Sequence, residues 1–138
     1  MRTISPSDVL RVLFGALFAL SLLIPTISVQ AEASQGKAAD VVNSYLGSLA
    51  TGDVQQINGL IAGAMRQRNR QLTLTPDYYG EFLRTHYAGV GMSVVSIRDK
   101  DEYVEARVRF DYPTSESTTI TFVLVQEEGA WKIADEIF

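Results

Sequence analysis

The sequence contains no cysteine and only one histidine, His86, and each of these scarcities excludes a kind of site. Without cysteine the chain has no disulfide, no thiolate metal ligand, no cysteine nucleophile and no lipid attached through a thiol. One histidine excludes a zinc site built from several histidines. We therefore expect neither a metal nor a cofactor, and a fold that depends on core burial for its stability.

Motifs that bind nucleotides or calcium are also missing. Gly89-x-Gly91 lacks the third glycine of a dinucleotide fingerprint and precedes a predicted strand instead of following one. Asp99-x-Asp101 starts like a calcium loop but lacks the later ligands. Acidic residues outnumber basic ones, 16 to 12, and this balance does not suit a nucleic-acid partner.

One apolar run stands out, close to the amino terminus. Val12–Ile24 carries no charge and is followed by Pro25. As a helix the run would cover roughly 20 Å, less than the ~30 Å hydrocarbon core of a bilayer. This length favours a signal peptide over residues 1–31, with cleavage after Ala31 or Ala33. We expect an exported protein, periplasmic or secreted; an uncleaved membrane anchor is the alternative.

Residues 32–138 have the size of one ordinary domain. Removal of the leader takes away Arg2, Arg11 and Asp8, so the remainder is more acidic than the −4 net charge of the whole chain. We expect this mature chain to contain no transmembrane segment and to bind no nucleic acid.

The first half of the domain has helical periodicity. Apolar side chains from Ala38 to Leu49 fall on one stripe, which predicts a helix that ends near Thr51. Asp53, with Gln56 three residues later, predicts an N-cap. The second helix should start there, with an apolar face that continues to Met65.

A polar segment, Arg66 to Thr75, follows and is expected to be irregular. Its Arg66-x-Arg68-x-Arg70 cluster could bind a carboxylate, a phosphate group or an anionic lipid through forked hydrogen bonds, or it could be a solvated loop. Thr75-Pro76 then predicts the cap and first turn of a third helix, which should stop near Gly89.

From Met92 onward the apolar period changes to two, which predicts antiparallel strands. Along Tyr103–Tyr112 apolar and charged residues alternate, so one face of this strand should be buried. The charged face, which carries Glu105, Arg107, Arg109 and Asp111, should be solvated or dimer-forming and should make cross-strand ion pairs. The four predicted strands are Met92–Arg98, Tyr103–Tyr112, Thr118–Gln126 and Ala130–Phe138. Helices followed by such a meander are typical of the α+β class.

Three sequence features carry a family resemblance. They are the pattern Ala39-Asp40-Val41-Val42-Asn43-Ser44-Tyr45-Leu46, the Gly52-Asp53 helix junction and the closing Gly129-x-Trp131-Lys132-Ile133 strand. Together they resemble the nuclear transport factor 2-like superfamily over nearly all of residues 32–138. The resemblance implies N-terminal helices packed on a curved antiparallel sheet, which enclose a cone with a cavity. It implies no single reaction, since the superfamily includes ketosteroid isomerases, dehydratases, hydrolases, polyketide cyclases and exported domains without known activity.

Two residues are candidates for catalysis in such a cone. Asp135 lies in phase with Trp131, Ile133 and Ile137, so it is the carboxylate expected to face inward, where it could act as a general acid or base. Exposure at the open end of the cone is nevertheless the favoured interpretation of Asp135. His86 would need a carboxylate partner for catalysis, and a packing or capping role is favoured for it.

Four aromatic residues are candidates for ligand binding: Tyr79, Phe82, Tyr112 and Trp131. Aromatic residues at helical and strand spacing also supply core packing, so some of them should belong to the core. If a cavity remains beside them, they favour a flat or hydrophobic small molecule.

These features support two hypotheses for function. The favoured one is an exported, non-enzymatic domain that binds a small apolar ligand in its cone or an envelope protein partner. A homodimer through the outer sheet face is a further expectation. The alternative is a small isomerase, dehydratase or hydrolase that uses Asp135 or His86 together with a tyrosine donor.

Overall fold

The computed structural model describes residues 33–138, so the signal peptide predicted for residues 1–31 lies outside the described residues. Residues 33–51 are helical and are called the first helix below. The elements that follow are α2 (Val54–Leu60), α3 (Gly63–Asn69), the 3-10 helix η1 (Leu72–Leu74), α4 (Pro76–His86), β1 (Gly91–Asp99), β2 (Val104–Asp111), β3 (Ser117–Glu127) and β4 (Ala130–Ile137). None of the helices in this part of the chain has the length and apolar character needed to span a bilayer.

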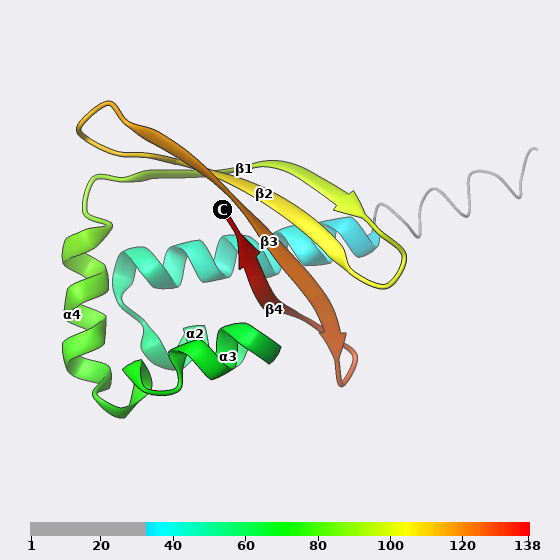
Figure 1. Ribbon diagram of the computed structural model, residues 1–138, viewed down its shortest axis with the longest axis horizontal. Coiled ribbons are helices and arrows are strands. Elements are labelled where there is room, and N and C mark those ends of the chain that lie inside the picture. The colour runs from blue at the N-terminus through cyan, green and yellow to red at the C-terminus, as the bar shows by residue number, and fades with distance from the viewer. Residues whose placement is uncertain (1–32) are drawn as a thin grey trace, which may run out of the picture. The chain divides into compact units, whose positions relative to one another are not determined.

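The four strands form one antiparallel meander in the order β1-β2-β3-β4. Their ends differ from the predicted ends by no more than one residue. In Figure 1 the first helix, drawn in cyan, lies with α2, α3 and α4 on one side of the twisted sheet. The predicted α+β fold, with helices packed on an antiparallel sheet, is therefore confirmed.

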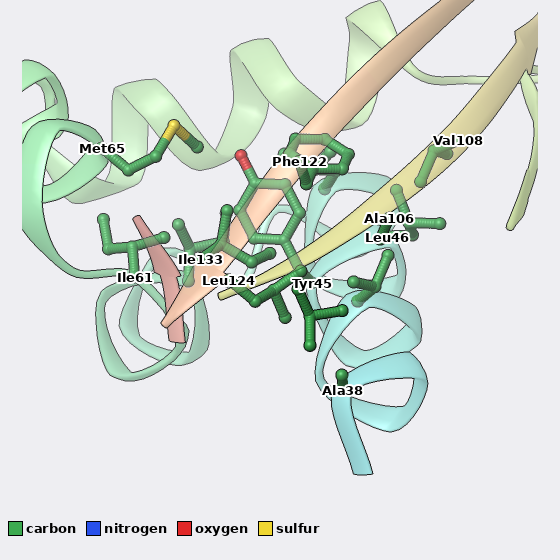
Figure 2. Packing of buried hydrophobic residues seen from close by; sticks show 14 of the residues in the cluster. Ala38, Tyr45, Leu46, Ile61, Met65, Ala106, Val108, Phe122, Leu124 and Ile133 are labelled. Carbon is green, nitrogen blue, oxygen red and sulfur yellow. The ribbon is translucent and has the colours of Figure 1, made fainter. Parts of the chain in front are cut away.

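The core lies between the first helix and the inner face of the sheet. Alternate residues of β2 are fully buried because every second side chain points to the same face of a strand. Tyr45 of the first helix packs edge-on against Phe122 of β3, with ring centroids 5.5 Å apart. Figure 2 shows these side chains interleaved with the central core residues Leu46, Ile61, Met65, Ala106, Val108, Leu124 and Ile133.

The outer face of the sheet carries the charged positions of β2, as predicted. The ion pair observed there joins Arg109 Nε to Asp111 Oδ1 at 2.8 Å, two residues apart on the same strand. The prediction of cross-strand pairs is therefore wrong for the described residues. Arg107 lies opposite Thr121 and Glu105 opposite Val123, so β3 presents no partner charge to them.

The start of α2 follows the predicted capping pattern only in part. Asp53 Oδ1 accepts a hydrogen bond from the Gln56 backbone N–H at 3.0 Å, which satisfies one of the free amides of the first turn. The Gln56 side chain does not return to Asp53. Its Oε1 instead accepts a hydrogen bond from the buried Ser48 hydroxyl at 2.6 Å, which ties α2 to the first helix. At α4 Pro76 occupies the first turn as predicted, but the Thr75 side chain makes no capping hydrogen bond.

The second helix is shorter than predicted. It ends at Leu60, and Ile61 takes an extended conformation (φ −111°, ψ 156°) instead of continuing the helix to Met65. Ile61 forms a parallel bridge with Ile133, and the Ala62 N–H donates to the Ile133 carbonyl at 2.9 Å. These two residues satisfy backbone groups at the free edge of β4, which outweighs the local helical pattern.

The segment predicted to be irregular after Met65 is mostly ordered helix. Arg66 and Arg68 lie in α3, and η1 follows before α4 begins. Met65 is the buried residue of α3, and this helix packs along β4. One buried side chain per helix is a weak periodic signal, which explains why the helix was not predicted.

Two glycines form a close contact between α4 and the end of the first helix. A Cβ atom on Gly80 would lie 2.6 Å from the Gly52 carbonyl oxygen, and a Cβ on Gly52 would collide with the Gly80 carbonyl oxygen. Gly52 also has a positive φ of 69°, which favours glycine. Only residues without a side chain let these two backbones approach so closely.

We expect Gly80→Ala to lower the free energy of unfolding by about 1–3 kcal/mol, because the added methyl group would force the two backbones apart. Gly47→Ala is the matched control, since Gly47 lies in the first helix with nothing within 4 Å of its would-be Cβ. Alanine there should stabilise the helix by roughly 0.5–1 kcal/mol. Urea denaturation measures both changes. Equal stability of the two variants would contradict the contact.

Candidate functional site

The position of each carboxylate on β4 is set by a bulge in that strand. Ile133 pairs with Leu124, but Asp135 pairs with Val123, so Ala134 is an extra residue without a partner. A bulge of this kind shifts the alternation of side chains by one position. The residue that pairs with buried Phe122, and so shares its inner face, is Glu136.

The prediction that Asp135 faces inward is therefore wrong. Asp135 shares the outer phase of Val123 and forms an ion pair with Arg68 of α3, with Nη2 and Oδ1 2.6 Å apart. Both side chains of this pair are about half exposed, at 49% and 48%. Solvent screens such pairs, which are typically worth about 0.2–1 kcal/mol. A catalytic role of Asp135 stays a prediction that its position does not favour.

Glu136 lies beside Tyr45, whose ring is buried in the core. Its strand neighbour Phe122 contacts the ring of Tyr45, which is only 6% exposed. In Figure 2 the Tyr45 hydroxyl points away from the first helix, past Phe122. Tyr79 of α4 and Tyr87, just after α4, are half-buried and pack against the same core. We call Glu136, Tyr45, Tyr79 and Tyr87 the tyrosine–carboxylate cluster.

The electrostatics of the tyrosine–carboxylate cluster favour neutral side chains. Burial raises the pKa of Glu136, which the positive charge of Arg68 opposes and the carboxylate of Asp135 reinforces. Burial, followed by the charge of Glu136, raises the pKa of Tyr45 and of Tyr79.

Burial also raises the pKa of Tyr87 to about 12, with smaller contributions from Tyr112 and Glu136. Near neutral pH the three phenols of the cluster therefore keep their protons and can donate hydrogen bonds. The cluster combines three such donors with one carboxyl group whose ionisation is disfavoured.

His86 lies outside the tyrosine–carboxylate cluster, exposed at the end of α4. Its ring stacks on Phe82, with centroids 5.6 Å apart, and meets Tyr87 edge-on at 4.8 Å and Tyr112 at 6.5 Å. Within residues 33–138 no hydrogen bond or ion pair joins it to a carboxylate. These ring contacts agree with the packing role favoured for His86, and a catalytic role stays a prediction.

The structure does not bring the four predicted ligand-binding aromatics to one place. Tyr79 lies in the tyrosine–carboxylate cluster, and Tyr112 is close to Tyr87 at its margin. Phe82 is 53% exposed and lines a groove on the surface of α4. Trp131 pairs with Gln126 near the β3–β4 turn, roughly 16 Å along the strand from Glu136. Ligand binding by these residues stays a prediction.

Sequence reasoning missed Glu136, Tyr45 and Tyr87 as site residues. No residue type marks the bulge at Ala134, so the strand pattern placed the wrong carboxylate inside. One signal was available: Asp135 and Glu136 are adjacent in a strand, so one of them had to face the helices. The part of the chain that the structure describes holds no group of three His, Asp or Glu side chains placed to bind a metal ion.

Two solved structures superpose on this chain and show which fold it has. A nuclear transport factor 2-like protein of unknown function from Silicibacter pomeroyi superposes with a TM-score of 0.55 at 10% identity, over 77% of this chain and 94% of that one. Another from Shewanella baltica superposes with a TM-score of 0.55 at 13% identity, over 76% and 91%. No protein-family model and no curated protein matches the sequence. The chain has the nuclear transport factor 2-like fold.

We expect Glu136→Gln to stabilise the domain at about pH 8 and to have no such effect at about pH 4. The pKa of Glu136 is raised in the folded chain above its ordinary value of 4.5. Stability from the protonated carboxyl is therefore present below that value and lost as the pH rises through the folded pKa. Glutamine stays neutral and avoids this loss. The melting temperature, measured across this pH range, checks the prediction.

Asp135→Asn is the matched control, because it removes a neighbouring carboxylate that is paired with Arg68 at the surface. This variant should not gain stability at the higher pH. A melting temperature of Glu136→Gln at or below that of the parent chain at pH 8 would contradict the inward position of Glu136.

Proposed function

We propose that the protein binds a small, largely apolar ligand at the tyrosine–carboxylate cluster on the inner face of its sheet. The observation that carries this proposal is the half-buried Glu136 among three protonated tyrosines. Because Glu136 is only half-buried, its carboxyl group can take a polar partner that approaches from solvent. A ligand hydroxyl or carbonyl group would supply one here.

The surroundings of the cluster favour an apolar body for this ligand. Phe110 and Phe122 are almost fully buried beside it, and Tyr87 packs 6.1 Å from the Phe110 ring. Small-molecule sites commonly combine such apolar walls with a few converging polar groups. The half-buried Tyr79 and Tyr87 leave part of this wall accessible to solvent.

Export and pairing belong to the same proposal. We take the protein to act outside the cytoplasm, with the leader removed after Ala31 or Ala33. A homodimer, or an envelope protein partner, would use the outer sheet face, where Arg107, Thr121 and Ile137 lie on neighbouring strands.

Native mass spectrometry of the protein, purified gently from the compartment that receives it, tests the proposal. We expect a reproducible small apolar mass that is lost on unfolding, and a polypeptide mass that starts at Glu32 or Ser34. In Glu136→Gln the bound mass should fall well below half occupancy, because the carboxyl group that orients the ligand is altered. Asp135→Asn, which changes the neighbouring carboxylate, should keep the ligand.

An empty protein in repeated preparations would overturn the ligand proposal and would favour an interaction domain. The same spectra report whether the chain is a monomer or a dimer. Equal loss of ligand from both variants would point to general destabilisation, and would count against a specific role of Glu136.

A second candidate function, proton transfer, is favoured by the raised pKa of Glu136. A carboxyl group in such an environment can act as a general acid or base, and neutral tyrosines can stabilise an oxyanion by hydrogen bonding. Glu136 then takes the role that the sequence assigned to Asp135 or His86 in a small isomerase, dehydratase or hydrolase.

Deuterium uptake measures this activity without knowledge of the substrate. We expect the protein in D2O to accelerate exchange at the carbon next to the carbonyl of simple cyclic ketones. Glu136→Gln should reduce the rate by about 100-fold or more. His86→Gln is the control and should keep the rate. Exchange no faster than in buffer alone would dismiss proton transfer for these ketones.

A further inference from the structure

The arginine cluster of α3 is divided between two roles. Arg68 is committed to Asp135, whereas Arg66 and Arg70 line a shallow groove together with Gly63 and Gln67. The groove has a volume of about 410 Å³. Arg66 also pairs with Glu127 at 2.8 Å, whereas the Arg70 guanidinium makes no ion pair within residues 33–138.

The side chain of Arg66 is held in a fixed position. Its Nη2 atom donates to the Ile61 carbonyl and to Glu127 Oε1, both at 2.8 Å. The Ile61 carbonyl belongs to the extended segment that borders β4, so the guanidinium is anchored to the sheet edge. A guanidinium has five donors, and this arrangement leaves those of Nη1 and Nε without a partner in residues 33–138.

Arg70 completes the groove from the end of α3. Its backbone N–H donates to the Gln67 carbonyl at 3.4 Å, and its carbonyl accepts from the Thr73 hydroxyl at 2.9 Å. In the described part of the chain its guanidinium makes no ion pair. Residues four apart in a helix lie on one face, so Arg66 and Arg70 place two positive charges side by side.

The Glu127 carboxylate compensates the charge of Arg66, but in the described residues no anion compensates the charge of Arg70 beside it. Guanidinium forks match the oxygens of phosphate, and the Gln67 amide adds a neutral donor on the same helix. A carboxylate has one charge and two oxygens in a single plane. A phosphate presents its free oxygens tetrahedrally, two with one charge in a diester and three with up to two charges in a monoester, so it can meet donors from more than one side. Phosphate therefore suits this set of donors better.

We propose that the groove lined by Arg66, Gln67 and Arg70 binds a phosphate group, which we call the α3 phosphate site. The phosphate belongs either to a free phosphorylated small molecule or to a lipid headgroup. Gly63 carries no side chain and keeps one end of the groove open. The site is independent of the tyrosine–carboxylate cluster, because none of its residues belongs to that cluster.

Titration of the full chain with inorganic phosphate, at constant ionic strength, tests the α3 phosphate site. We expect saturating NMR shifts of the Gln67 side-chain amide and of the Arg66 and Arg70 Nε–H signals. Arg70→Gln should weaken binding by about tenfold or more. Arg84→Gln is the matched control, since it removes the same charge from the exposed surface of α4. It should leave the affinity unchanged.

Two further probes separate the sources of the phosphate. Tighter binding of glycerol 3-phosphate, a monoester, would support a free phosphorylated molecule. Tighter binding of glycerophosphoglycerol, a diester that reproduces a lipid headgroup, would support a lipid. Shifts that never saturate, or that change equally in Arg70→Gln and Arg84→Gln, would show charge screening only and would overturn the site. Because Arg70 is exposed at a helix end, its replacement should leave the fold intact.

Discussion

The rest of this structure depends on the burial of one face of the antiparallel sheet. Alternate residues of β2, from Val104 to Phe110, are buried, and in this chain a layer of helices covers that face. The first helix does so through Tyr45, and α4 reaches it because Gly52 and Gly80 permit close approach. The inner face thereby acquires its polar residues as well, since Glu136 occupies a position in the same layer as Phe122.

The site is a product of two departures from regular structure. The bulge at Ala134 turns Glu136 inward, and the break after α2 lets Ile61 run along β4. The same break starts α3 near the strand, where Arg68 pairs with Asp135 and Arg66 is anchored by the Ile61 carbonyl. One bulge and one interrupted helix thus place a carboxylate among tyrosines and arginines along a sheet edge.

The features that could be predicted are those that depend on residues close together in the sequence. The alternation of apolar and charged residues along β2 predicted which face of the strand is buried and where the strand ends. Asp53 predicted the start of α2. The failures share a physical cause: Ile61 leaves its helix to satisfy a distant strand, and the bulge at Ala134 is defined by pairing with β3. Such long-range pairings leave no local pattern, so the α+β fold was predictable whereas the inward carboxylate was not.

Both edges of the sheet differ from a long, flat strand. Along β4, Ile61 and Ala62 occupy backbone groups that another strand could use. Along β1, the register shifts between Val94 and Ser96, which leaves Val95 unpaired and more than half exposed. Interrupted and covered edges resist the addition of strands from other molecules, the route by which sheets polymerise. Such a domain can reach high local concentrations with little risk of edge-to-edge aggregation.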